Sequence, residues 1–275
     1  MLALLVIGAT FQEPVRAWGS DGHAQIGNLA LQEADAGAAS RVWHLLGSND
    51  TEALAEACNW PDRVQKTPRW KWGEPQHFVN IPHTASRYAR DRDCPDDLCV
   101  TEAIKKYAGQ LADSRRDGRS RWRAFAWLCH LTGDLHQPLH AGYLDDRGGN
   151  SVEIIYRGEE ANLHQFWDRV LIQERLPHHS DWQNHIPGLT AHSATNAWNP
   201  SELNDWTSES HALVKLASYP PEKVIQADFA DQSWLLIRKQ WLKAGLRLAR
   251  ILNATLGEGE VVIETAEPAQ DNADD

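Results

Sequence analysis

The sequence predicts a mainly α fold that forms a single domain with one small β-hairpin. Apolar residues recur at helical spacing in seven segments, and only one segment alternates between apolar and polar residues as a strand does. No stretch rich in Pro, Gly and Ser divides the middle of the chain. The expected helices cover residues 22–34, 51–64, 101–114, 122–136, 161–174, 209–217 and 229–256, and the expected strand covers residues 151–156.

The composition fits a packed globular protein with an unusual supply of metal ligands. The 275 residues are 42% hydrophobic and 24% charged, which is enough for a sizeable core. Thirteen residues are His, although scattered His residues more often serve packing or the surface. The formal net charge of −11 argues against a tight, nonspecific nucleic-acid binder. It is compatible with a metal-dependent enzyme, because bound cations reverse the local sign of the charge.

The two ends of the chain differ from its middle. Residues 1–17 combine an apolar stretch with the small-residue pattern Val15-Arg16-Ala17 and are expected to be a secretory signal peptide. Residues 257–275 are expected to be an acidic, disordered tail, which leaves residues 18–256 for the domain. No later stretch reaches the roughly 18 apolar residues of a membrane span. The expected location is secreted or periplasmic, without stable membrane association.

The four cysteines fit an oxidising compartment without requiring one. Cys94 and Cys99 lie close together in a loop rich in Pro and Asp, so they are the pair expected to form a disulfide. Cys58 and Cys129 each precede a segment with candidate metal ligands. They either pair across two helices or remain buried thiols, and the sequence slightly favours the thiols.

Two His–Asp pairs at helical spacing are the strongest chemical signal. His130 and Asp134 are four residues apart, which places them on one face of a helix, and His164 and Asp168 repeat the spacing. Each pair alone is more often a surface hydrogen bond or ion pair than a metal site. Pro138 ends the first helix, so that His140 approaches from a turn. His136 lies off the face of His130 and Asp134 and is left out of the expected site.

Further candidate ligands precede these pairs. Asp62 follows Trp60-Pro61, and His77 follows Glu74-Pro75-Gln76, although either residue can instead serve helix capping or loop polarity. Mixtures of His and Asp are typical of zinc sites that hydrolyse substrates. Cleavage after Ala17 would free the α-amino group of Trp18, whose usual pKa of about 7.7–8.0 lets it bind a cation beside His23.

The ordered set of motifs resembles the S1/P1 nuclease family over essentially all of the expected mature chain. The resemblance implies a helical fold of the phospholipase C/nuclease type and three zinc ions. It also agrees with a disulfide between Cys94 and Cys99. The motifs are Trp18-Gly19-x-x-Gly22-His23, Trp60-x-Asp62, His77-Phe78, His130-x-x-x-Asp134-x-x-Gln137-Pro138-Leu139-His140, Gly148-Gly149-Asn150 and Asn162-Leu163-His164-x-x-x-Asp168.

The resemblance assigns the ligands to three ions and names substrate contacts. The first ion takes Asp62, His77, His130 and Asp134; the second takes His140, His164 and Asp168; the third takes the amine and carbonyl of Trp18, His23 and a bridging Asp134. Phe78 matches an aromatic residue that stacks on a base, although it can also be a core Phe beside a ligand. Asn150 belongs to the expected substrate-binding residues.

This sequence also departs from the family pattern. Asn80 stands where some members carry an Asp proposed to assist the attacking water, and Asn cannot act as a general base. Either the metals alone activate water, or another carboxylate helps. Gln65 stands where some members carry a phosphate-contacting Arg, so Arg63 is the candidate for that role. Arg147 replaces an apolar residue near the base pocket, which leaves the base preference open.

The expected activity is zinc-dependent endonucleolytic hydrolysis of single-stranded DNA or RNA that leaves 5′-phosphates, and an additional 3′-nucleotidase activity is left open. Single strands are expected because a stacked base must be splayed out. The partners are then nucleic acid or nucleotides, and the protein is expected to be a monomer. A zinc-dependent phospholipase C is the main alternative, although its first ligand spacing is longer and its last pair is HxxxE. A zinc-storage protein is a second alternative.

Overall fold

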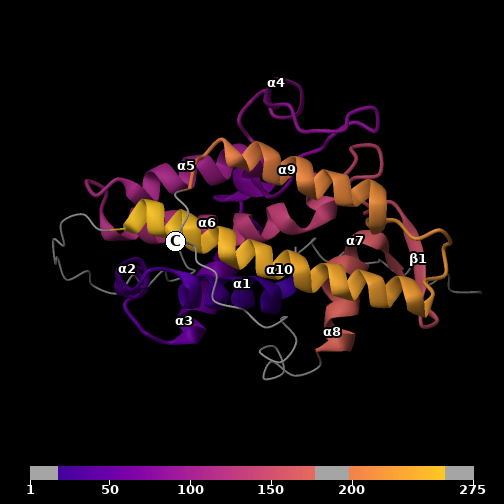
Figure 1. The fold of residues 1–275 in the computed structure, drawn as a ribbon, viewed down its shortest axis with the longest axis horizontal. Coiled ribbons are helices and arrows are strands. Elements are labelled where there is room, and N and C mark those ends of the chain that lie inside the picture. Colours follow the sequence, from indigo (N-terminus) through magenta and orange to yellow (C-terminus); the bar gives the residue numbers. More distant parts are fainter. Residues whose placement is uncertain (1–17, 177–197, 258–275) are drawn as a thin grey trace, which may run out of the picture.

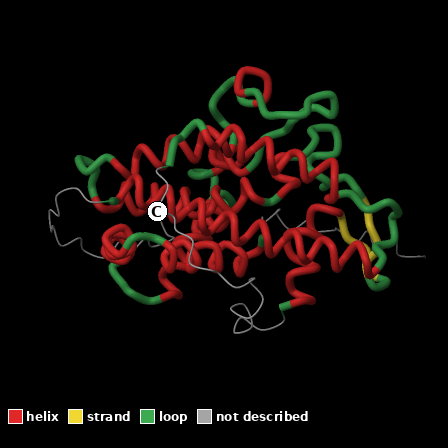
Figure 2. Tube along the Cα trace, in the orientation of Figure 1, coloured by secondary structure: helices red, strands yellow, loops and turns green. Residues whose placement is uncertain are grey.

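A computed structural model describes residues 18–176 and 198–257 of the chain, and the segments 1–17, 177–197 and 258–275 lie outside the described residues (Figure 1). The expected signal peptide falls outside this part, and so does the expected tail apart from Gly257. The described residues are mainly helical, with a single two-stranded sheet at one end of the molecule (Figure 2). The predicted fold class is therefore confirmed.

The described helices vary in length from one turn to eight. The α-helices are α1 (Gly19–Glu33), α2 (Ala36–Leu46), α3 (Thr51–Val64), α4 (Arg90–Asp93), α5 (Val100–Ala112), α6 (Gly118–His136), α7 (Leu163–Gln165), α8 (Leu171–Arg175), α9 (Glu202–Leu213) and α10 (Ala227–Leu256). Two short 3₁₀ helices are η1 (Lys71–His77) and η2 (Pro138–Ala141), and two π-helical turns are η3 (Phe166–Val170) and η5 (Val214–Ser218).

The hairpin consists of β1 (Glu153–Tyr156) and β2 (Glu159–Asn162), which pair antiparallel with Glu153 opposite Asn162. The two residues between the strands, Arg157 and Gly158, both have positive φ angles, as tight hairpin turns require. The predicted helix over residues 161–174 is wrong at its start, because Ala161 and Asn162 belong to β2. The Asn162 side chain then caps α7 by accepting from the Gln165 backbone N–H.

Helix α6 forms the centre of the molecule, and every residue from Ala124 to His136 is buried. The long helix α10 crosses the whole molecule, with α9 along one side of it and α1 along the other (Figure 1). The N-terminus of α6 is capped by Asp117, which accepts from the Ser120 backbone N–H. Its C-terminus comes just before Pro138, which cannot continue the helix. This buried part of the helix holds the polar side chains of His130 and Asp134 away from bulk water.

A disulfide joins Cys58 of α3 to Cys129 of α6, with the two Cα atoms 5.2 Å apart. The expectation of buried thiols was therefore wrong. Both cysteines face Gly27 of α1, where a Cβ would lie 2.7 Å from the Cys58 sulfur. The missing side chain at Gly27 lets three helices meet at the disulfide, and that approach depends on tertiary packing.

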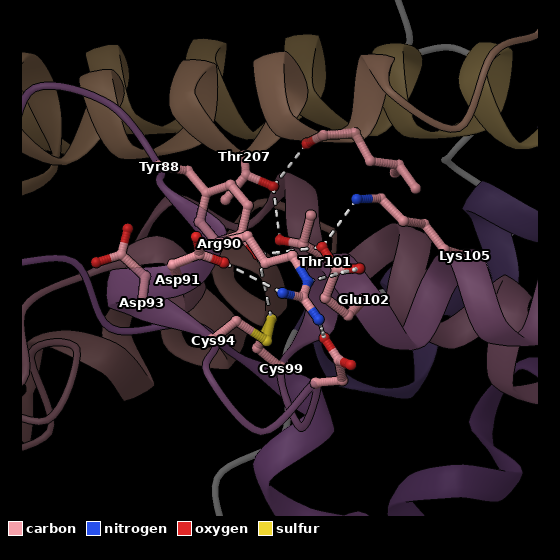
Figure 3. The surroundings of a disulfide bond; sticks show 12 residues. Tyr88, Arg90, Asp91, Asp93, Cys94, Cys99, Thr101, Glu102, Lys105 and Thr207 are labelled. Carbon is pink, nitrogen blue, oxygen red and sulfur yellow. Dashed lines mark hydrogen bonds and ion pairs between the residues drawn. A yellow bond between two sulfur atoms is a disulfide. The ribbon is translucent and has the colours of Figure 1, made fainter.

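The predicted disulfide between Cys94 and Cys99 is confirmed, and it closes the loop between α4 and α5 (Figure 3). Next to it, Arg90 forms an ion pair with Asp97, and the Tyr88 hydroxyl donates to Glu102. Thr101 and Thr207 share a hydrogen bond of 2.7 Å that ties α5 to α9. Among the described residues, no helix is both long enough and apolar enough to span a membrane.

Candidate metal centre

Eight buried side chains from seven helical elements converge in three groups at the centre of the molecule. In each group the candidate ligand atoms lie within 4.8 Å of one another. The groups are His23, His130 and Asp134; Asp62, His77 and His130; and His140, His164 and Asp168. The structure thus brings together every predicted ligand side chain, and it places His130 in two groups at once.

Asp134 lies between two of these groups, and each of its carboxylate oxygens faces a different one. Its Oδ1 is 3.4 Å from His23 Nε2. Its Oδ2 is 3.4 Å from His130 Nε2 and 2.9 Å from His77 Nδ1. The carboxylate is fully buried. A carboxylate with this orientation can bridge two cations, because it offers one oxygen to each.

The spacing of the donor atoms fits zinc. Two donors that each lie about 2.1 Å from one zinc ion in tetrahedral geometry are about 3.4 Å apart. His130 Nε2 is 3.4 Å from Asp62 Oδ1 and 3.4 Å from Asp134 Oδ2. The distance from His23 Nε2 to Asp134 Oδ1 is also 3.4 Å. The donors are His nitrogen and carboxylate oxygen, both of which are ordinary zinc ligands.

Backbone carbonyls orient three of the histidines so that their Nε2 atoms point into the centre. The Nδ1 atom of His130 lies 2.9 Å from the Cys58 carbonyl, that of His140 lies 2.6 Å from the His77 carbonyl, and that of His164 lies 2.6 Å from the Gly148 carbonyl. The Nε2 atoms of His140 and His164 are buried and have no hydrogen-bond partner among the described residues. Metal-binding histidines are usually held in this way, with the second ring nitrogen on a carbonyl.

Orphaned polar atoms also mark the group around His23. Both ring nitrogens of His23 and Oδ1 of Asp134 are buried without a hydrogen-bond partner among the residues described. An unpaired buried polar atom costs about 1–3 kcal/mol, so several together in one place indicate a missing partner. The ring of His23 stacks on that of His130, with centroids 3.8 Å apart. Two stacked imidazoles beside one carboxylate are compatible with cation binding.

The third group is held by a glutamine that the sequence reasoning did not assign. Gln137 Nε2 donates to Asp168 Oδ1 at 2.6 Å, and its Oε1 accepts from the Leu139 backbone N–H. Asp168 Oδ2 then faces His164 Nε2 at 3.1 Å. Gln137 stands at the end of α6, so the same helix positions His130, Asp134 and Asp168. The sequence offered one signal for this role, because Gln137 lies within the motif that carries His130, Asp134 and His140.

Burial and mutual charge shift the pKa values of these groups strongly. Burial, with a contribution from His130, lowers the pKa of His23 to about 3, so its ring is neutral and able to bind a metal. Burial also acts to lower the pKa of His130, but Asp134 and Asp62 outweigh it and raise the pKa to about 9. For Asp134, burial alone would raise the pKa, but His130 and His140 hold it well below its usual range. The carboxylate stays ionised, and a divalent cation competes with the proton on His130.

Trp18 is buried beside this centre. Its indole Nε1 donates to the Gly133 carbonyl at 2.7 Å, one residue before Asp134. Its ring packs edge-on against Trp241 of α10, with centroids 5.8 Å apart. A Cβ on the next residue, Gly19, would lie 3.4 Å from the Asp168 carbonyl oxygen. The side chain therefore anchors the start of α1 next to α6 and η3.

A cavity of about 580 Å³ opens over the candidate metal centre. Its walls include the candidate ligands Asp62, His77, His140 and His164. Phe78 also lines the cavity and is 37% exposed, so it is not a buried core residue. Asn80 and Asn150 line the same cavity.

The predicted contact at Arg63 is not found in the cavity wall. Arg63 is exposed at the end of α3 and is not among the lining residues, whereas Gln65, Lys66, Glu74 and Arg147 are. Gln65 Nε2 donates to Asp62 Oδ1 at 2.8 Å, so this side chain orients a candidate ligand. His136, which was left out of the predicted site, lies elsewhere, with Nδ1 on the Thr132 carbonyl and Nε2 on Arg247.

Comparison with known proteins supplies the family. The family model described as S1/P1 nuclease matches residues 18–257. The chain belongs to the S1/P1 nuclease family. Endonuclease 2 of Arabidopsis thaliana is 34% identical, with 94% of this chain and 97% of the relative covered. Endonuclease 3 of the same plant is 30% identical, with 86% and 88% covered. Nuclease P1 of Penicillium citrinum is 28% identical, with 87% and 98% covered.

Membership of the S1/P1 nuclease family makes the chain a hydrolase of phosphodiester bonds and confirms the predicted resemblance. The comparisons favour the nuclease over the zinc-dependent phospholipase C that the sequence left as an alternative. The family is zinc-dependent in general, and the three ligand groups described above fit that dependence.

Proposed function

We propose that this protein is a zinc-dependent endonuclease that cleaves single-stranded DNA or RNA and leaves 5′-phosphates, with 3′-nucleotidase activity as a related reaction of the same site. The observation that carries the proposal is the placement of Asp134, whose two oxygens face separate histidine groups beneath an open cavity. Zinc held by these residues would supply a Lewis acid that polarises the phosphate and lowers the pKa of water toward ~7. The chain's own residues would hold the ions and position the nucleic acid.

The proposed ligand sets follow the three groups. Asp62, His77, His130 and Asp134 would hold one ion, and His140, His164 and Asp168 would hold a second. His23 and Asp134 would hold the third together with the amine and carbonyl of Trp18, after the signal peptide is removed behind Ala17. Burial of Trp18 beside Gly133 supports this position for the mature terminus. Mass spectrometry of the exported protein tests the cleavage, and a terminus other than Trp18 would contradict it.

The cavity wall suggests how the substrate is held. Phe78 offers an exposed ring on which a base can stack, and such stacking tolerates any base. Asn80 and Asn150 can hydrogen-bond to substrate, but Asn80 cannot accept a proton as a general base. Glu74 is a further carboxylate in the wall and is the proposed proton acceptor. Lys66 takes the phosphate-binding role that the sequence had assigned to Arg63.

The two disulfides support export to an oxidising compartment, and we propose that the protein acts outside the cytoplasm, secreted or periplasmic, as a monomer. Size-exclusion chromatography with light scattering tests the monomer, and a mass of two chains would contradict it.

The decisive experiment combines elemental analysis with an activity assay. Mature wild-type protein should contain zinc and hydrolyse single-stranded DNA, and a chelator should abolish the activity. Asp134→Asn should lose zinc and at least about a hundredfold in rate, because an amide offers only one oxygen where the carboxylate spans two groups. Asp145→Asn, an exposed carboxylate outside the ligand groups, is the control. Full zinc content and activity in Asp134→Asn would contradict the proposed function.

A further inference from the structure

A strip of positive charge adjoins the metal centre of this acidic protein. Residues 63–73 contain the four cations Arg63, Lys66, Arg69 and Lys71 and no acidic residue, although the whole chain has a net charge of −11. All four cations are exposed. The strip runs from the end of α3, just after Asp62, into η1, which ends at His77. It therefore connects two candidate ligands along the chain.

Aromatic residues alternate with these cations. Trp70 and Trp72 flank Lys71, and Trp72 is 48% exposed. The Lys106 ammonium from α5 lies 5.4 Å from the centroid of the Trp72 ring. A large, half-exposed indole beside lysines is typical of a surface that binds single-stranded nucleic acid, because bases stack on the ring and phosphates meet the cations.

Ring contacts connect Trp72 to the candidate metal centre. It packs on Trp127 of α6 at a centroid distance of 6.0 Å, and Trp127 packs on the ring of His77 at 5.5 Å. A Cβ on Gly73 would lie 2.6 Å from Trp127, so η1 approaches α6 closely at this point. One indole therefore separates the exposed Trp72 from a candidate zinc ligand.

The same strip reaches the mouth of the cavity. Lys66, Glu74, His77 and Phe78 all line the cavity, and Trp72 lies two residues before Glu74 in η1. Among the described residues, Lys66 and Lys71 form no ion pair, so their charges remain available to phosphates. Lys66 therefore belongs both to the strip and to the cavity wall, and η1 carries Trp72 together with the wall residues Glu74 and His77.

We propose that Trp72, Lys71 and Lys106, which we call the Trp72 surface, extend the substrate site and bind the nucleotides next to those in the cavity. This proposal rests on the proposed function and adds a strand of several nucleotides as the preferred substrate. The indole stacks on a base outside the cavity, and the lysines contact the flanking phosphates. Short substrates fill the cavity alone and gain nothing from this surface.

The test compares a dinucleotide with a single strand of about 12 nucleotides, a length within the range of single-strand sites. For each protein the measured quantity is kcat/KM on the strand divided by kcat/KM on the dinucleotide. Trp72→Ala should lower this ratio about tenfold, mainly through a higher KM for the strand. Trp72→Phe should restore most of the ratio, because it keeps an aromatic face.

Lys71→Ala provides a second variant at an exposed residue, in case Trp72→Ala disturbs Trp127. It should reduce the dependence of log KM for the strand on log salt by about 0.7, the value for one lost phosphate contact on a single strand. Lys239→Ala, an exposed cation on α10, is the matched control and should change neither the ratio nor the salt slope.

A wild-type ratio in Trp72→Ala together with a wild-type salt slope in Lys71→Ala would overturn the Trp72 surface. If zinc-loaded wild-type protein cleaves neither substrate, the proposed function has failed instead. Fluorescence anisotropy of a labelled phosphorothioate strand then tests the surface by itself. Weaker binding by Trp72→Ala than by Lys239→Ala supports the surface, and equal binding overturns it.

Discussion

Asp134 shows how one residue organises the centre. It is fully buried, and it stays ionised because His130 and His140 outweigh the effect of burial on its pKa. Its neighbour Gly133 contributes the carbonyl that anchors Trp18 and leaves room for the ring of His23. At this scale the absence of a side chain matters as much as the presence of a ligand.

Gly133→Ala should therefore reduce zinc content, although Ala is normally the better helix residue by about 1 kcal/mol. Its Cβ would lie 2.8 Å from His23 Nδ1 and 3.0 Å from Cε1, so the ring must move away from Asp134. Elemental analysis checks the zinc content. Gly109→Ala on α5 is the matched control, since its Cβ meets nothing within 4 Å, and its zinc content should match the wild type. An unchanged zinc content in Gly133→Ala would contradict this account of His23.

At the scale of elements, α6 connects the parts of the site. It carries His130 and Asp134, ends at His136 just before Gln137, and is tied to α3 by the disulfide between Cys58 and Cys129. The Cys58 carbonyl also orients His130. The disulfide that links α3 to α6 therefore lies next to the hydrogen bond that orients His130.

Removing this disulfide should cost far more stability than removing the other one. The bond between Cys58 and Cys129 spans 71 residues, and restriction of a loop of that length in the unfolded chain stabilises the fold by roughly 4 kcal/mol. The bond between Cys94 and Cys99 spans 5 residues, for which the same relation gives about 2 kcal/mol. Urea unfolding of Cys58→Ala/Cys129→Ala and Cys94→Ala/Cys99→Ala measures the two losses. Equal losses would show that loop closure does not govern the difference.

At the scale of the whole molecule, charge is distributed unevenly. The net charge is −11, yet the Trp72 surface beside the cavity is positive. Ion pairs hold the outer helices together elsewhere, and Glu209 of α9 contacts both Lys243 and Arg247 of α10. These contacts join the two long helices that lie side by side in Figure 1.

This junction should make stability depend on pH at the acidic end. Burial acts to raise the pKa of Glu209, but hydrogen bonds from Lys243 and Arg247 lower it from 4.5 to about 2. The stabilisation is therefore complete above pH 4.5 and is lost as the pH falls toward 2. Glu209→Gln should lose about 1 kcal/mol at neutral pH, because partly exposed ion pairs are screened, and should match the wild type near pH 2.

Urea unfolding as a function of pH measures this difference. Glu153→Gln is the control, because its ion pair with Lys223 is exposed to solvent and should contribute nothing measurable. A loss in Glu209→Gln that stays constant down to pH 2 would rule out the ionised carboxylate as its source.

The sequence by itself determined the helical class and the hairpin, and it predicted the eight candidate ligand side chains that the structure brings together. Spacing along one helix is a local property, so His130 with Asp134 and His164 with Asp168 were readable from the chain. The helix over residues 36–46 was missed, although Ala38 and Val42 are buried on one face of it. The 3₁₀ helix η1 was missed because Gly73 and Pro75 obscure any periodicity.

Only the tertiary structure decided which distant residues meet. Three contacts join residues of different helices. They are the disulfide between Cys58 and Cys129, the approach of Asp134 to His23, and the hydrogen bond from Gln137 to Asp168. The same is true of the contact between Trp72 and Trp127. Such contacts depend on how closely helix faces approach one another, and that approach is set by side-chain packing across the whole core rather than by any local pattern.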